Sequence, residues 1–233
     1  MNDESEKAAN SAANIWDWVR DYFGIARRGR RNPVIDTDGL RLFIETRSSH
    51  VAQTSLYGYI RTRAGTRFPE LFENDTFIES LNIAKWQIWL ACVGDLSVYA
   101  GGLIASRAGA SQEQVSALMT SIVDDILERT GTPDDSGEKF GKGAAHVRGR
   151  IADMEWAAVT DDETPFSESP EALIEWAPIV DDLKQYDTEI VMNSARFRWH
   201  EVRRDLRRDL DAEAVLNSAP PGGAGQPDDA PTD

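Results

Sequence analysis

The sequence is poor in the residues that build redox, metal and nucleophilic sites. It has one cysteine, Cys92, and three histidines, none of which follows a glutamate at position i−3. It contains no HExxH, CxxC, GxSxG, Walker or GxGxxG motif. A lone cysteine excludes an intramolecular disulfide, and an apolar environment such as that around Cys92 makes a thiol unreactive. We therefore predict no bound metal, no cofactor and no catalytic motif.

The chain also lacks a positive balance of charge. Its 233 residues carry a formal net charge of −15, and this disfavours nucleic acid as a partner, since nucleic-acid binding rests on lysine and arginine. The charge is uneven: residues 13–68 hold ten arginines and five acidic residues, whereas the rest is strongly acidic. The basic part could meet an anionic partner or fold back on the acidic body of the protein.

No secretory signal begins the sequence, because the first residues lack a charged segment followed by an apolar one. The absence of paired cysteines agrees with a reducing compartment. The prediction from these features is a cytoplasmic protein, with attachment to the inner face of the membrane as the alternative location.

Apolar residues are concentrated between Phe77 and Ile104, on every side of what would be one helix. Lys85, Gln87 and Asp95 interrupt this segment, which argues against a membrane span. It is expected to be the buried centre of a helical domain. The pair Gly101 and Gly102 indicates either close approach by another helix, or a kink or helix end.

Alternating strand patterns are missing and helical spacing recurs almost throughout. The fold class predicted is all-α, a bundle of five to seven helices around the long apolar helix. We expect disordered residues 1–12, one helical domain over 13–217, and a disordered acidic, Pro/Gly-rich tail over 218–233. The expected helices cover about 14–23, 37–62, 75–108, 112–130, 144–158 and 169–216.

Local signals fix several of these helix ends. Asn74 or Asp75 should cap the central helix, and Ser111 with Gln114 forms a capping box. Ser169, followed by proline, is predicted to cap the last helical stretch, with a kink at Pro178. That stretch carries two apolar runs at helical spacing, the second continuing the first: Ile179, Leu183, Tyr186, Ile190 and Phe197, then Trp199, Val202, Leu206 and Leu210.

The N-terminal part holds the first candidate site, where aromatic residues precede a basic cluster. Such a segment suits a protein partner or an anionic membrane surface, with rings at headgroup level and arginines on lipid phosphate. The alternative is a helix that docks its aromatic side chains on the bundle. The candidate binding residues are Trp16, Trp18, Tyr22, Phe23, Arg27, Arg28, Arg30 and Arg31.

Two smaller groups could carry chemistry. Arg61, Arg63 and Arg67 surround Gly65 and could hold an anion, or could cap the end of a helix. Lys85 and Asp95 should be paired if buried, Asp95 with an arginine of another helix and Lys85 with a carboxylate such as Glu189. Structural pairing is one interpretation of Lys85 and Asp95, and a proton-transfer role is the other.

The stretch FIETRSSHVAQTSLYGYIRTRAGTRFPELFENDTFIESLNIAKWQIW (43–89) resembles a largely uncharacterised family of bacterial helical proteins, some members of which carry an esterase label. The resemblance transfers no site residues. The run from Val93 to Ser97 is similar to the Gly-Asp-Ser block of one esterase family, but Leu96 stands where that block has serine.

These features together predict a non-enzymatic helical adaptor or accessory subunit that binds a protein partner. A peripheral membrane protein that uses the N-terminal aromatic and basic segment is the first alternative, and an esterase-like hydrolase is the second. Self-association into a homo-oligomer stays open.

Overall fold

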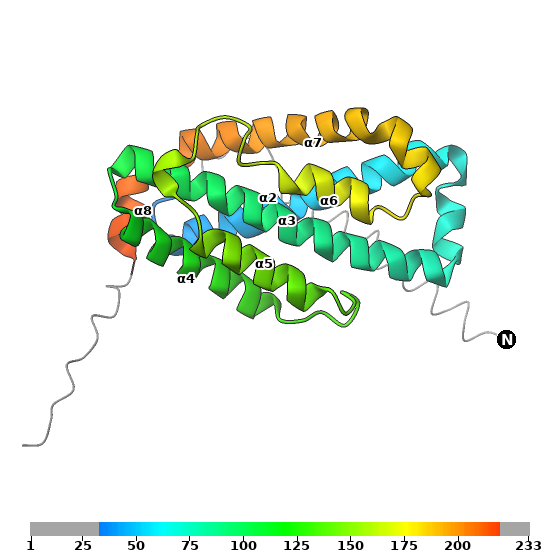
Figure 1. Ribbon diagram of the computed structural model, residues 1–233, viewed down its shortest axis with the longest axis horizontal. Coiled ribbons are helices and arrows are strands. Elements are labelled where there is room, and N and C mark those ends of the chain that lie inside the picture. Colours follow the sequence, from blue (N-terminus) through cyan, green and yellow to red (C-terminus); the bar gives the residue numbers. More distant parts are fainter. Residues whose placement is uncertain (1–32, 220–233) are drawn as a thin grey trace, which may run out of the picture.

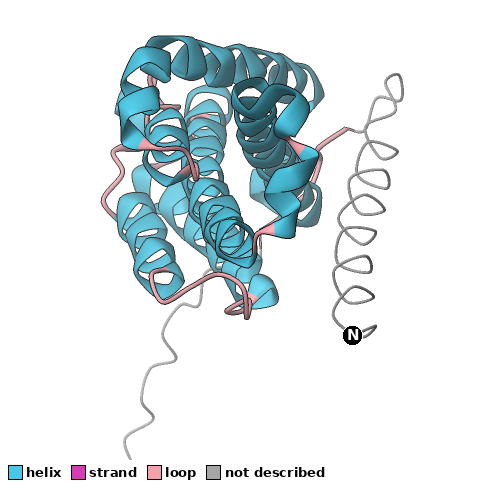
Figure 2. Ribbon diagram, turned by 90° about the vertical axis from the view of Figure 1, so that its right-hand side faces the viewer, coloured by secondary structure: helices cyan, strands magenta, loops and turns pink. Residues whose placement is uncertain are grey.

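The computed structural model describes residues 33–219, and within them it contains seven α-helices and no strand. The helices are α2 (Thr37–Ala64), α3 (Asp75–Ala108), α4 (Gln112–Thr130), α5 (Phe140–Ala152), α6 (Glu168–Trp176), α7 (Asp181–Asp209) and α8 (Ala212–Ser218), with short 3-10 turns η1 (Gly65–Arg67), η2 (Pro69–Glu73) and η3 (Trp156–Ala158). The predicted all-α fold is confirmed (Figure 2). The seven helices agree with the expected five to seven. The helix expected over 14–23 lies outside the described residues.

Helix α3 is the centre of the bundle (Figure 1). It contacts α2, α4, α5, α6 and α8, and from Gln87 to Ile104 every residue is buried. Of the described residues, α3 is the one helix long and apolar enough to cross a membrane, and nearly all of its apolar window is buried inside the bundle. The apolar segment therefore forms the core, as predicted.

Several local signals place the helix ends correctly. Asn74 accepts a hydrogen bond from the amide of Phe77 at 3.0 Å and caps α3. Ser111 and Gln114 form the reciprocal capping box at the start of α4. Gly109 ends α3 in the left-handed conformation that favours glycine.

The two glycines of α3 mark close contact, as one of the two interpretations predicted. A Cβ added at Gly101 would lie 2.3 Å from Cζ3 of Trp156, and one at Gly102 would lie 2.4 Å from Val159. The approaching element is η3 and the residue after it, rather than another α-helix. The lack of a glycine side chain lets the fully buried Trp156 lie against the α3 backbone.

Two of the expected helices have the wrong bounds. The helix predicted over 144–158 covers Phe140–Ala152 and is followed by η3. It begins earlier than expected because the buried Phe140 anchors its first turn. The stretch expected to continue over 169–216 is broken twice. It stops at Ala177, which takes extended backbone before Pro178, and again at Leu210, whose backbone pairs with Val34.

Candidate functional site

Asp95 joins three helices in the interior. Its carboxylate is fully buried on α3 and accepts a hydrogen bond from the Arg150 guanidinium of α5 at 2.7 Å. It also accepts the backbone amides of Glu168 at 3.3 Å and Ser169 at 2.8 Å, the first two residues of α6. The predicted pairing of Asp95 with an arginine of another helix is confirmed.

This carboxylate also replaces the local cap that the sequence predicted for α6. The serine before the helix, Ser167, makes no capping hydrogen bond, and Ser169 lies inside the helix as a donor to Asp95. A carboxylate is favourable at a helix N-terminus because the helix dipole is positive there. The expectation that Ser169 caps the helix is therefore wrong, since a residue from another helix occupies that role.

The surroundings of Asp95 are those of a structural tie. Burial raises the pKa of Asp95, and the Arg150 guanidinium and the amides of α6 oppose that rise by stabilising the ionised form. Next to Asp95, the indole of Trp199 donates a hydrogen bond to the hydroxyl of Ser169 at 2.8 Å. Burial also raises the pKa of the Cys92 thiol well above its usual range, so Cys92 is not poised as a nucleophile.

Lys85 does not share a site with Asp95. It pairs with Asp135 in the loop after α4, at 2.9 Å, and the indole of the adjacent Trp86 donates to the same carboxylate at 2.6 Å. The suggested partner Glu189 is wrong, because α3 places Lys85 beside the loop between α4 and α5 instead of α7. Ten residues separate Lys85 from Asp95, which is about 15 Å along a helix.

The three arginines around Gly65 take different partners. The Arg63 guanidinium binds Asp187 of α7, which also accepts the hydroxyl of Tyr59 at 3.0 Å. Arg67 pairs with Glu70 at 3.4 Å on the surface, and Arg61 is exposed. Arg63 therefore ties α2 to α7 and is not available to hold an anion with Arg61 and Arg67.

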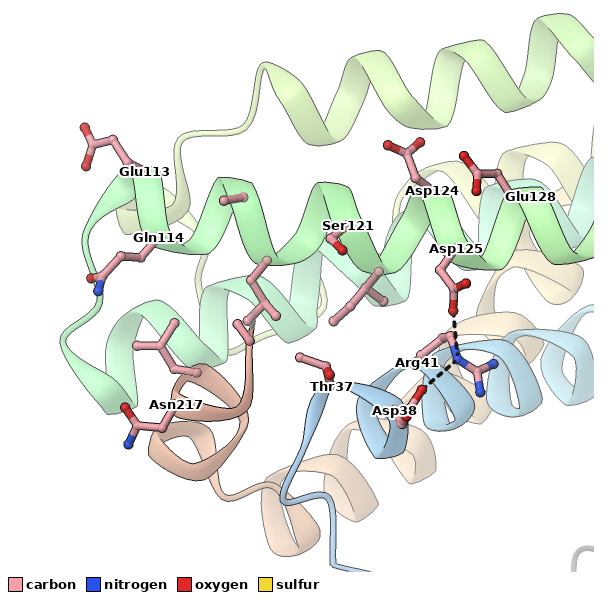
Figure 3. Close-up of a pocket in the computed structure, with 15 residues that line it drawn as sticks. Thr37, Asp38, Arg41, Glu113, Gln114, Ser121, Asp124, Asp125, Glu128 and Asn217 are labelled. Carbon is pink, nitrogen blue, oxygen red and sulfur yellow. Dashed lines mark ion pairs between the residues drawn. The ribbon is translucent and has the colours of Figure 1, made fainter. Parts of the chain in front are cut away.

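A groove with a volume of about 970 Å³ lies between α2, α4 and α8 (Figure 3). Five carboxylates line it, but three of them are already paired: Asp124 with Arg148 at 2.6 Å, and Asp125 and Asp38 with Arg41 at 3.1 and 3.6 Å (Figure 3). No histidine or cysteine is among its lining residues. No group of three or more histidine, cysteine, aspartate or glutamate residues in the described part of the chain could hold a metal ion.

The most unusual surface is the outer face of α7. Tyr186, Ile190 and Phe197 are 76%, 72% and 78% exposed, and Leu183 begins the same row at 40%. The row is presented on a helix that runs along the outer edge of the bundle (Figure 1). We call these four residues the α7 apolar row. Exposed apolar patches on a protein surface are often interaction sites.

The opposite face of α7 supplies a second apolar row, which is buried. Val191, Ala195, Trp199, Val202 and Leu206 pack into the core. Phe197 and Trp199 are two positions apart, which is roughly 200° around a helix axis. The two runs seen in the sequence therefore do not continue one another, and the prediction of one continuous stripe is wrong.

Sequence reasoning missed the α7 apolar row as a site, although the sequence contained a signal for it. Residues two apart do not share a helix face, so the step from Phe197 to Trp199 shows that the helix has two apolar sides. The predicted binding residues Trp16, Trp18, Tyr22, Phe23, Arg27, Arg28, Arg30 and Arg31 lie outside the described residues.

Comparison with known proteins adds no relative from which a function could be inferred. No family model matches the chain, and neither a curated protein nor a solved structure matches it.

Proposed function

We propose that this chain is a non-enzymatic helical adaptor or accessory subunit that binds protein through the α7 apolar row. The observation that carries the proposal is the exposure of Tyr186, Ile190 and Phe197 on one helix face. Burying apolar area is the main favourable term in protein association, and aromatic side chains are common anchors in such interfaces.

The bundle holds this face in a fixed orientation. Asp187, next to Tyr186 in the chain, is bound by Arg63 and Tyr59 of α2. Further along α7, the Arg198 guanidinium donates to the hydroxyl and carbonyl oxygens of Thr54 at 3.2 and 3.3 Å. A preformed face loses less conformational entropy when it binds, so these ties favour association.

The alternatives have weaker support. Charges of both signs flank the α7 apolar row, among them Asp182, Glu189 and Arg196, and such a surface has no preference for anionic lipid. For a hydrolase, Ser97 is fully buried in the middle of α3 and cannot meet a substrate. The N-terminal aromatic and basic segment remains a prediction for a further protein or membrane contact.

A photo-crosslinking amino acid, p-benzoylphenylalanine, tests the proposal when it replaces Tyr186 in cells that make the protein. We expect a covalent protein adduct on irradiation, and loss of that adduct when Ile190→Ser and Phe197→Ser are added. The matched control places the same amino acid at Leu42, an exposed apolar residue of α2.

Recovery of the chain without any protein adduct from position 186 would overturn the proposal. Equal adducts from positions 186 and 42 would do the same, because they would show random collision instead of a specific face.

A further inference from the structure

The spacing of residues along the outer face of α7 is that of a helix–helix seam. Leu183, Tyr186, Ile190, Asn193, Phe197 and His200 follow one another at intervals of three, four, three, four and three residues, and all six are exposed. Alternation of three and four is the pattern by which one helix packs along another in a coiled coil. The seam is about 27 Å long at 1.5 Å per residue.

We infer that the occupant of the α7 apolar row is the α7 helix of a second copy of this chain, lying antiparallel to the first. This deepens the proposed function, on which it rests, by naming the partner. The symmetry axis would pass between Ile190 and Asn193, and the interface would be the same patch on both copies.

The seam is self-complementary about that axis. In the antiparallel register Tyr186 faces Phe197 of the second copy, and Phe197 faces Tyr186 of the second copy, so one aromatic pair forms on each side of the axis. Leu183 faces His200 at each end. Ile190 faces Asn193 in the same reciprocal way.

The flanking charges select the antiparallel orientation. Glu189 and Arg196 are exposed and each directly precedes a seam residue. In the antiparallel pair, Glu189 and Arg196 of the second copy lie on the same side of the seam and differ in level by two residues, about 3 Å, so each is within reach of its opposite. A parallel pair would instead set Asp182 beside Asp187, Glu189 beside Ser194 and Arg196 beside Glu201. Glu189 thus has a cationic partner in the antiparallel arrangement and none in the parallel one, where two aspartates also meet.

Sedimentation equilibrium of the purified full chain is the first test. We expect the mass to rise with concentration from the 25.9 kDa of one chain to twice that value. Phe197→Asp should weaken association at least about 30-fold, the effect of a hot-spot residue. Leu42→Asp, the same change at an exposed apolar residue of α2, should leave association unchanged.

Charge reversal tests the orientation. E189R alone and R196E alone should each weaken association by about tenfold. The contact between positions 189 and 196 occurs twice in the symmetric pair, and either substitution places like charges at both contacts. The double variant E189R/R196E should regain the wild-type affinity, since the opposite charges then exchange places. A parallel pair would not be restored, because Glu189 and Arg196 do not meet in it.

Cysteine pairing gives an independent measure of orientation. Leu183→Cys and His200→Cys should form a disulfide with each other when the two variants are mixed, and neither should crosslink alone. The native Cys92 is buried and does not compete. Crosslinking of Leu183→Cys with itself would mean a parallel pair and would overturn the inference.

A wild-type chain that stays monomeric at all concentrations would also overturn the inference. If Trp16→Ser and Trp18→Ser in the full chain then produced a dimer, the occupant would be the N-terminal segment of the same chain. If the chain is a monomer and the photo-crosslinked adduct at position 186 contains a different protein, the inference is overturned but the proposed function stands. A monomer with no adduct would overturn both.

Discussion

Helices α3 and α7 are the two longest of the described helices, and they use apolar residues in opposite ways. Helix α3 is apolar on all sides and is enclosed by its neighbours from Gln87 to Ile104. Helix α7 is apolar on two opposite sides, of which one packs on α2 and α6 and the other stays exposed. The comparison teaches that an apolar residue of a helix belongs to the core only when another element covers that face of the helix.

Within α7, the two faces should differ most clearly in their effect on stability. Trp199→Ala should lower the free energy of unfolding by about 3–5 kcal/mol, because a large fully buried side chain is removed. Phe197→Ala should change it by less than about 0.5 kcal/mol, since surface changes are small. Urea unfolding measures both, at protein concentrations low enough to suppress self-association. Equal losses would show that Phe197 is a core residue.

The buried tie of α3 should be next in size. Asp95→Ala should cost about 3 kcal/mol of stability, because it removes the carboxylate partner of the buried Arg150 and the cap of α6. Glu168, at 3.2 Å from Arg150, limits the loss. Arg148→Ala breaks an ion pair with Asp124 on the surface of the same helix α5 and should cost less than about 1 kcal/mol.

A catalytic role for Asp95 would give a different result for the conservative variant. Asp95→Asn would then leave the urea midpoint unchanged and abolish an activity, whereas a structural tie predicts a lower midpoint.

Close packing against α3 can be tested with one substitution at two glycines. Gly101→Ala should destabilise the protein by about 1–3 kcal/mol, since its Cβ would lie 2.3 Å from Trp156. Gly149→Ala on α5, where a Cβ meets nothing within 4 Å, should stabilise it by up to about 1 kcal/mol. Thermal unfolding of the two variants should move in opposite directions, and a shift in the same direction would contradict the close contact.

The last effect is confined to alkaline solution, where the tyrosines titrate. Burial raises the pKa of Tyr57 to about 12, and burial with a hydrogen bond to Asp161 raises the pKa of Tyr99 to about 12. A phenol with a raised pKa stabilises the folded state below pH 10, and this contribution is lost as pH rises from 10 to 12. The urea midpoint should therefore stay flat up to about pH 9 and fall above pH 10.

Ultraviolet absorbance of tyrosinate checks the same prediction directly. Tyr99→Phe should reduce the slope of stability above pH 10. Titration of Tyr57 and Tyr99 in the folded protein near pH 10, the ordinary value for tyrosine, would contradict it.

Much of the fold could be predicted because the relevant interactions are short in sequence. The caps at Asn74 and Ser111 bond within three residues of themselves, and the apolar character of α3 requires no knowledge of its neighbours. The two glycines at 101 and 102 also signalled a close approach correctly. The partners of Lys85 and Arg63 could not be predicted, since Asp135 and Asp187 lie 50 and 124 residues further along the chain.

The sequence by itself determined that α7 has two apolar sides, because the helical repeat places Phe197 and Trp199 on opposite faces. It also determined that α3 is buried, since a helix that is apolar on all sides has no polar face to expose to solvent. Only the tertiary structure decided which side of α7 is covered: α2 and α6 pack on one face and fix it there through Arg63, Asp187 and Trp199. It also decided that Asp95 caps α6, because that contact joins residues more than seventy positions apart.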